Sequence, residues 1–120
     1  LDGYVSQLFE LAQKEGKDAK YIEANVLETE IDETDLLFID TWHCYDQLFA
    51  ELTKHAPKVK KYIAFHDTQT YGTRSEEFMG RVGSNGLLPA IIHYLIENPN
   101  TWQFKIHRTN NNGLTVIERV

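Results

Sequence analysis

In DLLFIDTWH, residues 35–43, an apolar run without alternation ends abruptly on an acid. A run of this kind is typical of a strand that is buried on both faces of a parallel sheet, so we predict a central strand over residues 36–39. The stretch YIAFHDT, residues 62–68, repeats the pattern and closes on a second acid. Because ligands bind outside the carboxyl ends of parallel strands, Asp40 and Asp67 are predicted to line a binding crevice.

The segment between the two strands has the spacing of a helix. Apolar side chains recur at helical intervals from Tyr45 to Ala56, and Pro57 cannot continue a helix, which predicts one over about 44–55. Upstream, a helix is predicted over roughly 3–15, followed by a short strand at Lys20–Ala24 and an acidic segment, 25–35, with no clear period.

The residue pattern in the second half of the chain predicts a long loop, a helix and a hairpin. Residues 68–86 hold four of the seven glycines, and a loop of that length in a compact domain is usually functional or disordered. A helix is predicted over about 88–95, and two strands, 102–106 and 114–120, form an antiparallel hairpin. The predicted fold is therefore α/β, an open sheet with a parallel core and an antiparallel hairpin at its edge.

Composition limits the classes of partner. With 120 residues, of which 42% are hydrophobic, the chain is expected to form one domain, residues 1–120. The formal charge of -6 disfavours nucleic acid as a partner. Cys44 is the single cysteine and cannot form an internal disulfide, and the apolar stretches are too short to span a bilayer. We expect a cytoplasmic protein with no membrane partner.

Two neighbouring carboxylates repel each other unless a cation or a shared proton lies between them. Mg²⁺ is suited to this position, because it takes oxygen ligands and leaves other positions for water or substrate. His43, three residues after Asp40, is a candidate base for a substrate hydroxyl. The alternative is that Asp40 or Thr41 is only the N-cap of the following helix.

Other residues are interpreted as structural. His66-Asp67 is similar to the histidine-aspartate doublet of metal phosphohydrolases, but that doublet lies on a helix and this one follows an apolar strand. Cys44 is interpreted as a buried structural thiol. The remaining histidines have no ligand spacing between them and are interpreted as structural or solvated; they are His55, His93 and His107.

Together, residues 35–45 and 62–68 resemble the class I S-adenosylmethionine-dependent methyltransferases, in particular the branch of cephalosporin hydroxylase-like proteins and metal-dependent sugar O-methyltransferases. In that branch an aspartate-x-x-histidine motif follows the fourth strand. A second motif follows the fifth strand; it consists of an acidic residue or a histidine, then aspartate and threonine. The resemblance spans roughly residues 5–120 and includes the closing hairpin, which matches the family's sixth and seventh strands. It implies a Rossmann-like sheet.

The resemblance also implies roles for individual residues. Asp40 and Asp67 match magnesium ligands, with His66 in the place of a glutamate ligand, and His43 matches the catalytic base. The matches for S-adenosylmethionine binding are Asn25, Val26, Asp40 and Trp42, with Asn25 in the place of the residue that contacts the adenine amino group.

The family's cofactor loop is absent from this sequence. A glycine-rich turn after the first strand and an acid after the second have no counterpart here, so the chain is expected to be the C-terminal portion of a methyltransferase domain, incomplete at its N-terminal half. The strand at 36–39 would then have an unpaired edge, which predicts a homo-oligomer. We also expect weak or no cofactor binding by the chain alone.

Three functions compete. The first is O-methyl transfer to a hydroxylated small molecule with metal assistance. The second, a signalling receiver domain, is disfavoured because its acidic pair and lysine are not in the required places. The third is a non-catalytic binding or assembly module that retains the methyltransferase fold.

Overall fold

The computed structural model describes residues 3–120, with side chains from Val5 onward, so residues 1 and 2 of the predicted domain lie outside the described range. The chain folds as an α/β domain with a mixed, open four-stranded sheet. The elements are α1 (Gly3–Lys14), β1 (Thr34–Ile39), α2 (Tyr45–His55), a 3₁₀ turn (Ala56–Lys58), β2 (Val59–His66), β3 (Glu77–Phe78), β4 (Arg81–Val82), α3 (Leu87–Glu97), β5 (Trp102–Arg108) and β6 (Leu114–Arg119).

The order of strands in the sheet is β1-β2-β6-β5. β1 and β2 are parallel, as expected for strands joined through a helix, whereas β6 is antiparallel to both β2 and β5. The predicted closing hairpin is confirmed, but the parallel core consists of a single pair of strands. The last strand of the chain lies between β2 and β5, so the turn before β6 meets the end of β2.

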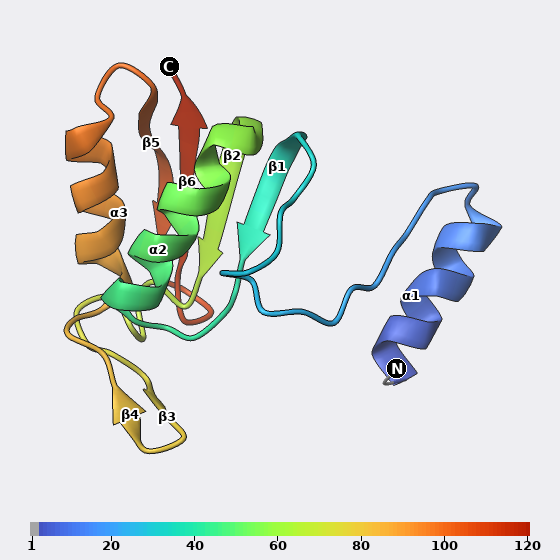
Figure 1. Cartoon of the computed structure of the whole chain (residues 1–120), viewed down its shortest axis with the longest axis horizontal. Helices are drawn as coiled ribbons and strands as arrows, with labels where there is room; N and C mark the ends of the chain where they lie inside the picture. The colour runs from blue at the N-terminus through green and yellow to red at the C-terminus, as the bar shows by residue number, and fades with distance from the viewer. Residues whose placement is uncertain (1–2) are drawn as a thin grey trace.

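Helices α2 and α3 cover one face of the sheet (Figure 1). Leu48 and Leu52 of α2 are fully buried against Ile63 of β2 and Ile91 of α3, in one hydrophobic core. This packing explains the predicted helical spacing, because residues three and four apart share one face of a helix. The helix over 44–55 and the one over 88–95 are both confirmed with small changes at their ends.

Two local predictions were wrong. The segment Lys20–Ala24 is not a strand; Tyr21 and Ile22 are 51% and 69% exposed, because no neighbouring strand offers them a ladder of hydrogen bonds. β1 is not a central strand buried on both faces. It is the edge of the sheet, and Leu36 and Phe38 on its uncovered face are each 55% exposed.

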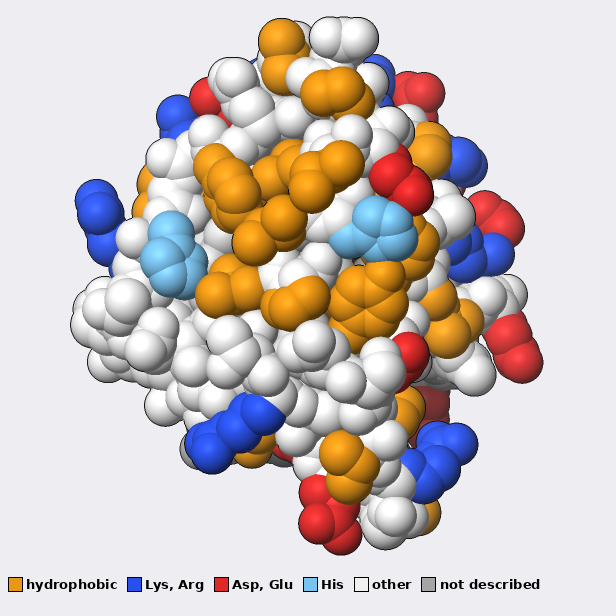
Figure 2. Space-filling model, turned by 90° about the vertical axis from the view of Figure 1, so that its left-hand side faces the viewer, with side chains coloured by type: hydrophobic (Ala, Val, Ile, Leu, Met, Phe, Trp, Pro, Cys, Tyr) orange, Lys and Arg blue, Asp and Glu red, His pale blue; other side chains and the backbone are white. Residues whose placement is uncertain are grey.

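The predicted loop over 68–86 contains a short antiparallel hairpin, β3–β4, which projects from the body of the domain (Figure 1). The predicted N-terminal helix is confirmed as α1, which lies apart from the sheet. Figure 2 shows hydrophobic side chains gathered on the face that carries α3, where Ile92 and Ile96 are exposed. Within residues 3–120, no helix has both the length and the hydrophobicity needed to cross a bilayer.

Candidate metal centre

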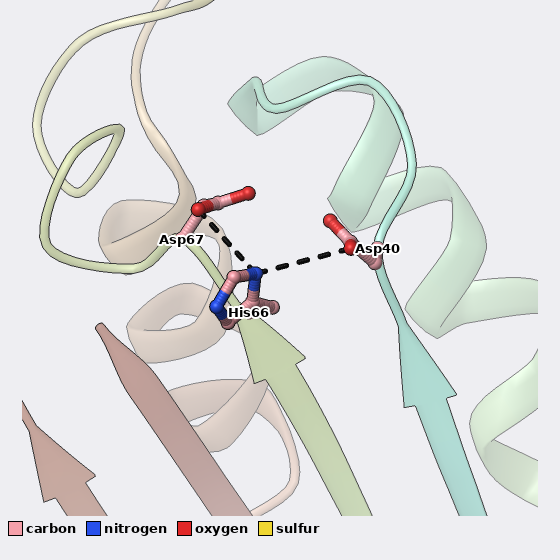
Figure 3. A group of neighbouring side chains, drawn as sticks. All are labelled: Asp40, His66 and Asp67. Atoms are coloured by element: carbon pink, nitrogen blue, oxygen red, sulfur yellow. Dashed lines mark ion pairs between the residues drawn. The ribbon is translucent and has the colours of Figure 1, made fainter. Parts of the chain in front are cut away.

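Asp40 and Asp67 follow the adjacent ends of the two parallel strands. Ile39 of β1 is the register partner of Phe65 of β2, so the residues after both strands emerge at the same edge of the sheet. Figure 3 shows Asp40, His66 and Asp67 pointing toward one another. One ligand atom from each lies within 4.8 Å of the others, and Asp67 and His66 are only partly exposed. The structure therefore brings together the three side chains that were predicted as metal ligands.

The backbone of Asp67 has an unusual conformation. Its φ is 64°, in the left-handed region that non-glycine residues seldom adopt, and its N–H donates to the Gly113 carbonyl at 3.0 Å. Gly113 itself has a φ of 103° and lies against the backbone of Gln69. The turn before β6 thus supports the backbone that carries Asp67. Strained backbone of this kind often occurs where a side chain must be aimed at a functional site.

His43 lies between the two aspartates. Its Nε2 is 2.9 Å from Asp40 Oδ1 and 2.9 Å from Asp67 Oδ2. The imidazole stacks on the ring of Tyr71, with centroids 5.1 Å apart and an interplanar angle of 11°. Because only 13% of the His43 side chain is exposed, the ring is held between these neighbours and has little freedom to turn toward solvent.

Glu76 completes the surroundings of His43, and sequence reasoning missed it. Glu76 Oε1 lies 3.1 Å from His43 Nδ1, and the Glu76 N–H donates to the His43 carbonyl at 2.7 Å. The indole N–H of Trp42 donates to the Glu76 carbonyl at 2.9 Å. The only sequence signal for this contact was the long glycine-containing loop, which indicated a functional segment without indicating which residue in it approaches the site.

The capping alternative for Asp40 and Thr41 was wrong. Helix α2 begins at Tyr45, and its N-cap is Cys44, which makes no side-chain cap hydrogen bond. The Thr41 hydroxyl instead lies 2.7 and 2.9 Å from the two carboxylate oxygens of Glu51. Burial raises the pKa of the Glu51 carboxyl, and the Thr41 hydrogen bond opposes that shift. Burial likewise raises the pKa of the Cys44 thiol, which agrees with a structural role.

A cavity of about 360 Å³ lies beside β1, and Ile39 and Thr41, the two chain neighbours of Asp40, are among its lining residues. Its walls come from the segment before β1, from β1 itself and from α2, and Val26 is among the lining residues. Asn25 is not among the lining residues, because its Oδ1 accepts a hydrogen bond from the Leu27 N–H at 2.9 Å within a local turn. The indole N–H of Trp42 donates to the Glu76 carbonyl, and its ring lies 6.4 Å from that of Phe78 with the planes tilted by 40°. Of the residues predicted to bind the cofactor, Val26 lines this cavity, Asp40 stands at the candidate metal centre, and Asn25 and Trp42 are engaged elsewhere.

The donor set fits a divalent cation. Two carboxylates and one imidazole, those of Asp40, Asp67 and His66, each offer one ligand atom within 4.8 Å of the others, and carboxylates this close repel each other unless positive charge lies beside them. Comparison of the chain with protein-family models, with curated proteins and with solved structures finds no match.

Proposed function

We propose that the chain is the C-terminal part of an S-adenosylmethionine-dependent O-methyltransferase that acts on a hydroxylated small molecule with the assistance of a divalent metal. The observation that carries this proposal is the convergence of Asp40, Asp67 and His66 at the carboxyl ends of two parallel strands, with His43 beside them. The same residues match the metal ligands and base of the family that the sequence resembles. The mixed sheet with a closing antiparallel hairpin agrees with the Rossmann-like fold that this resemblance implies.

The chemistry follows from the positions of these side chains. A bound divalent cation would polarise the acceptor hydroxyl and make its proton easier to remove. Asp40 and Asp67 would hold that cation through their carboxylates, and His43 is the base that the resemblance implies. Because no group of the protein has to form a covalent bond, the rate would come from orientation and from stabilisation of developing negative charge.

The cavity beside β1 is the proposed place for the adenine end of S-adenosylmethionine. It is largely apolar, with Ile22, Val26 and Leu37 among its lining residues, as expected for a site that takes a flat aromatic ring. Thr41 also lines it, one residue after the candidate metal ligand Asp40. The segments that bind the methionine and ribose ends in this family have no counterpart in the chain, so we expect an affinity in the millimolar range or weaker. A micromolar dissociation constant by calorimetry would contradict this part of the proposal.

The experiment that tests the proposal is calorimetric titration of the metal-free chain with divalent cations. We expect saturable binding of one cation, lost in Asp40→Asn and in Asp67→Asn. Asp35→Asn is the matched control, because Asp35 is an exposed acid on β1 whose Oδ2 lies 3.8 Å from Lys61 Nζ, outside the site. Asp35→Asn should bind like the wild type. Failure of the wild-type chain to bind any divalent cation would refute metal assistance and favour the alternative, a catalytically inactive module with this fold.

A further inference from the structure

The sheet has one face that carries no helix. Helices α2 and α3 pack on the other face, and the free one, here called the uncovered face, is apolar near β1. Leu36 and Phe38 are each 55% exposed there, and Tyr62 of β2 lies beside them, because it is the register partner of Leu36. Parallel strands in α/β domains are normally covered by helices on both faces. The uncovered face therefore has the composition of a surface on which a helix packs.

Helix α1 carries an apolar stripe that is open to solvent in the described part of the chain. Leu8, Leu11 and Ala12 share one side of the helix, and the two leucines are 56% and 55% exposed. Glu10 and Lys14 lie on the opposite side. A helix of only 12 residues is marginally stable in water by itself. The stripe on α1 therefore needs a surface to pack on.

The connector from α1 to β1 is fastened to the domain only near its far end. Gly16, with a φ of 69°, follows α1, and residues 17–24 form neither helix nor strand. From Val26 onward the chain is held against α2, because the Val26 carbonyl accepts a hydrogen bond from His55 Nε2 at 2.6 Å and Lys54 Nζ lies 2.8 Å from Glu30 Oε1. Since α2 is on the covered side, α1 would have to turn around the β1 edge to reach the uncovered face of its own sheet. Figure 1 shows α1 beyond that edge, away from the other strands.

We infer that two copies of the chain exchange α1, so that the helix of each copy packs on the uncovered face of the other copy's sheet. The leucines of the α1 stripe then contact Phe38 and its neighbours on β1 and β2, and the charged side of the helix stays in water. The contact is reciprocal, so the two copies are related by a twofold axis. Both apolar surfaces that the single chain exposes around β1 and α1 are covered in one step.

The area of such an exchange is sufficient for a specific dimer. A helix of 12 residues is about 18 Å long and about 10 Å wide. Two of these helices, each docked along one side, bury on the order of 1,200 Å² in total with both partners counted, which is the lower end of the range for stable interfaces. We therefore expect a dimer that forms reversibly with concentration.

The first test detects contacts between copies in the wild-type chain. In an equimolar mixture of carbon-13-labelled and unlabelled chains, isotope-filtered nuclear Overhauser spectra report only contacts between a labelled and an unlabelled copy. We expect contacts between the Leu11 methyl groups of one copy and the Phe38 ring of the other. Contacts between α1 and the sheet that occur only within one copy would overturn the exchange. No variant has to fold for this measurement.

The second test places a charge in the apolar stripe. Leu8→Lys should raise the dissociation constant of the dimer, measured by sedimentation equilibrium, at least about 100-fold, because two buried leucines are lost per dimer. Lysine is a good helix former, so the substitution does not act by unfolding α1. Glu10→Lys is the matched control, because it places the same residue on the opposite, exposed side of the helix, and it should leave the dissociation constant nearly unchanged.

Two results in sedimentation equilibrium would overturn the exchange. One is a wild-type chain that stays monomeric up to the highest concentration at which it is soluble. The other is a dimer that Leu8→Lys leaves intact, because its interface would then lie elsewhere. No residue of the candidate metal centre takes part in the exchange, so either result leaves the proposed function to be decided by cation titration.

Discussion

Gly113 should be among the least replaceable residues of the chain, because it supports the backbone at Asp67. A Cβ atom at position 113 would lie 2.2 Å from the Gln69 nitrogen and 3.0 Å from the Thr68 carbonyl carbon, whereas ordinary contacts begin at 3.4 Å. The loop after β2 would have to move by about 1 Å. That movement would disturb two hydrogen bonds, from the Asp67 N–H to the Gly113 carbonyl and from the Gln69 N–H to the Asn112 carbonyl.

The cost of Gly113→Ala has two components. A non-glycine residue at positive φ costs about 1–2 kcal/mol, and each disturbed backbone hydrogen bond costs about 1 kcal/mol. We therefore expect the free energy of unfolding to fall by about 3–4 kcal/mol, a large part of the stability of a typical domain. The folded fraction should also lose affinity for divalent cations, because Asp67 moves with the loop.

Gly80→Ala is the matched control, because Gly80 also has a positive φ, 76°, but a Cβ there would meet nothing within 4 Å. It should cost only this conformational penalty, about 1–2 kcal/mol, and keep wild-type cation affinity. Urea denaturation followed by circular dichroism measures both variants. If the two variants differ in unfolding free energy by less than about 1 kcal/mol, the steric argument for Gly113 is refuted.

Two further predictions follow from the buried acid and the exposed strand. Burial raises the pKa of the Glu51 carboxyl in the folded chain above its ordinary value of 4.5, so the folded state binds the Glu51 proton more tightly than the unfolded state does. The free energy of unfolding therefore falls as the pH rises from 4.5 through the pKa of Glu51 in the folded state. Glu51→Gln removes this penalty and keeps an acceptor oxygen for the Thr41 hydroxyl, so the free energy of unfolding at pH 7 should be higher in the variant than in the wild type. Urea denaturation at pH 4 and pH 7 measures the change, and a variant no more stable than the wild type at pH 7 would contradict this prediction. The uncovered face of β1 is expected to promote self-association, because Phe38 on it is exposed at the edge of the sheet. Phe38→Lys should therefore shift the chain toward monomer in sedimentation equilibrium, whereas Ile96→Lys on α3 should not. The reverse result would place the interface on the α3 face.

The elements that depend on local sequence were predictable. The apolar spacing from Tyr45 to Ala56 and the stop at Pro57 define α2, because residues on one face of a helix bury together. The acids after two apolar runs, Asp40 and Asp67, indicated a site because parallel strands end at the same edge of a sheet. The prediction failed at Lys20–Ala24, where side chains favourable to a strand have no strand to pair with.

Local sequence patterns thus predicted the two strand ends, the helix between them and the closing hairpin, and they indicated the metal-ligand candidates at positions 40, 66 and 67. The surroundings of these candidates depend on the fold of the whole domain. Glu76 reaches His43 across 33 residues of sequence, and the Asn111 carbonyl reaches His66 across 45. Strand pairing and loop contacts join segments that are far apart in the chain, so no local pattern of residues indicates which backbone carbonyl or carboxylate will orient a histidine.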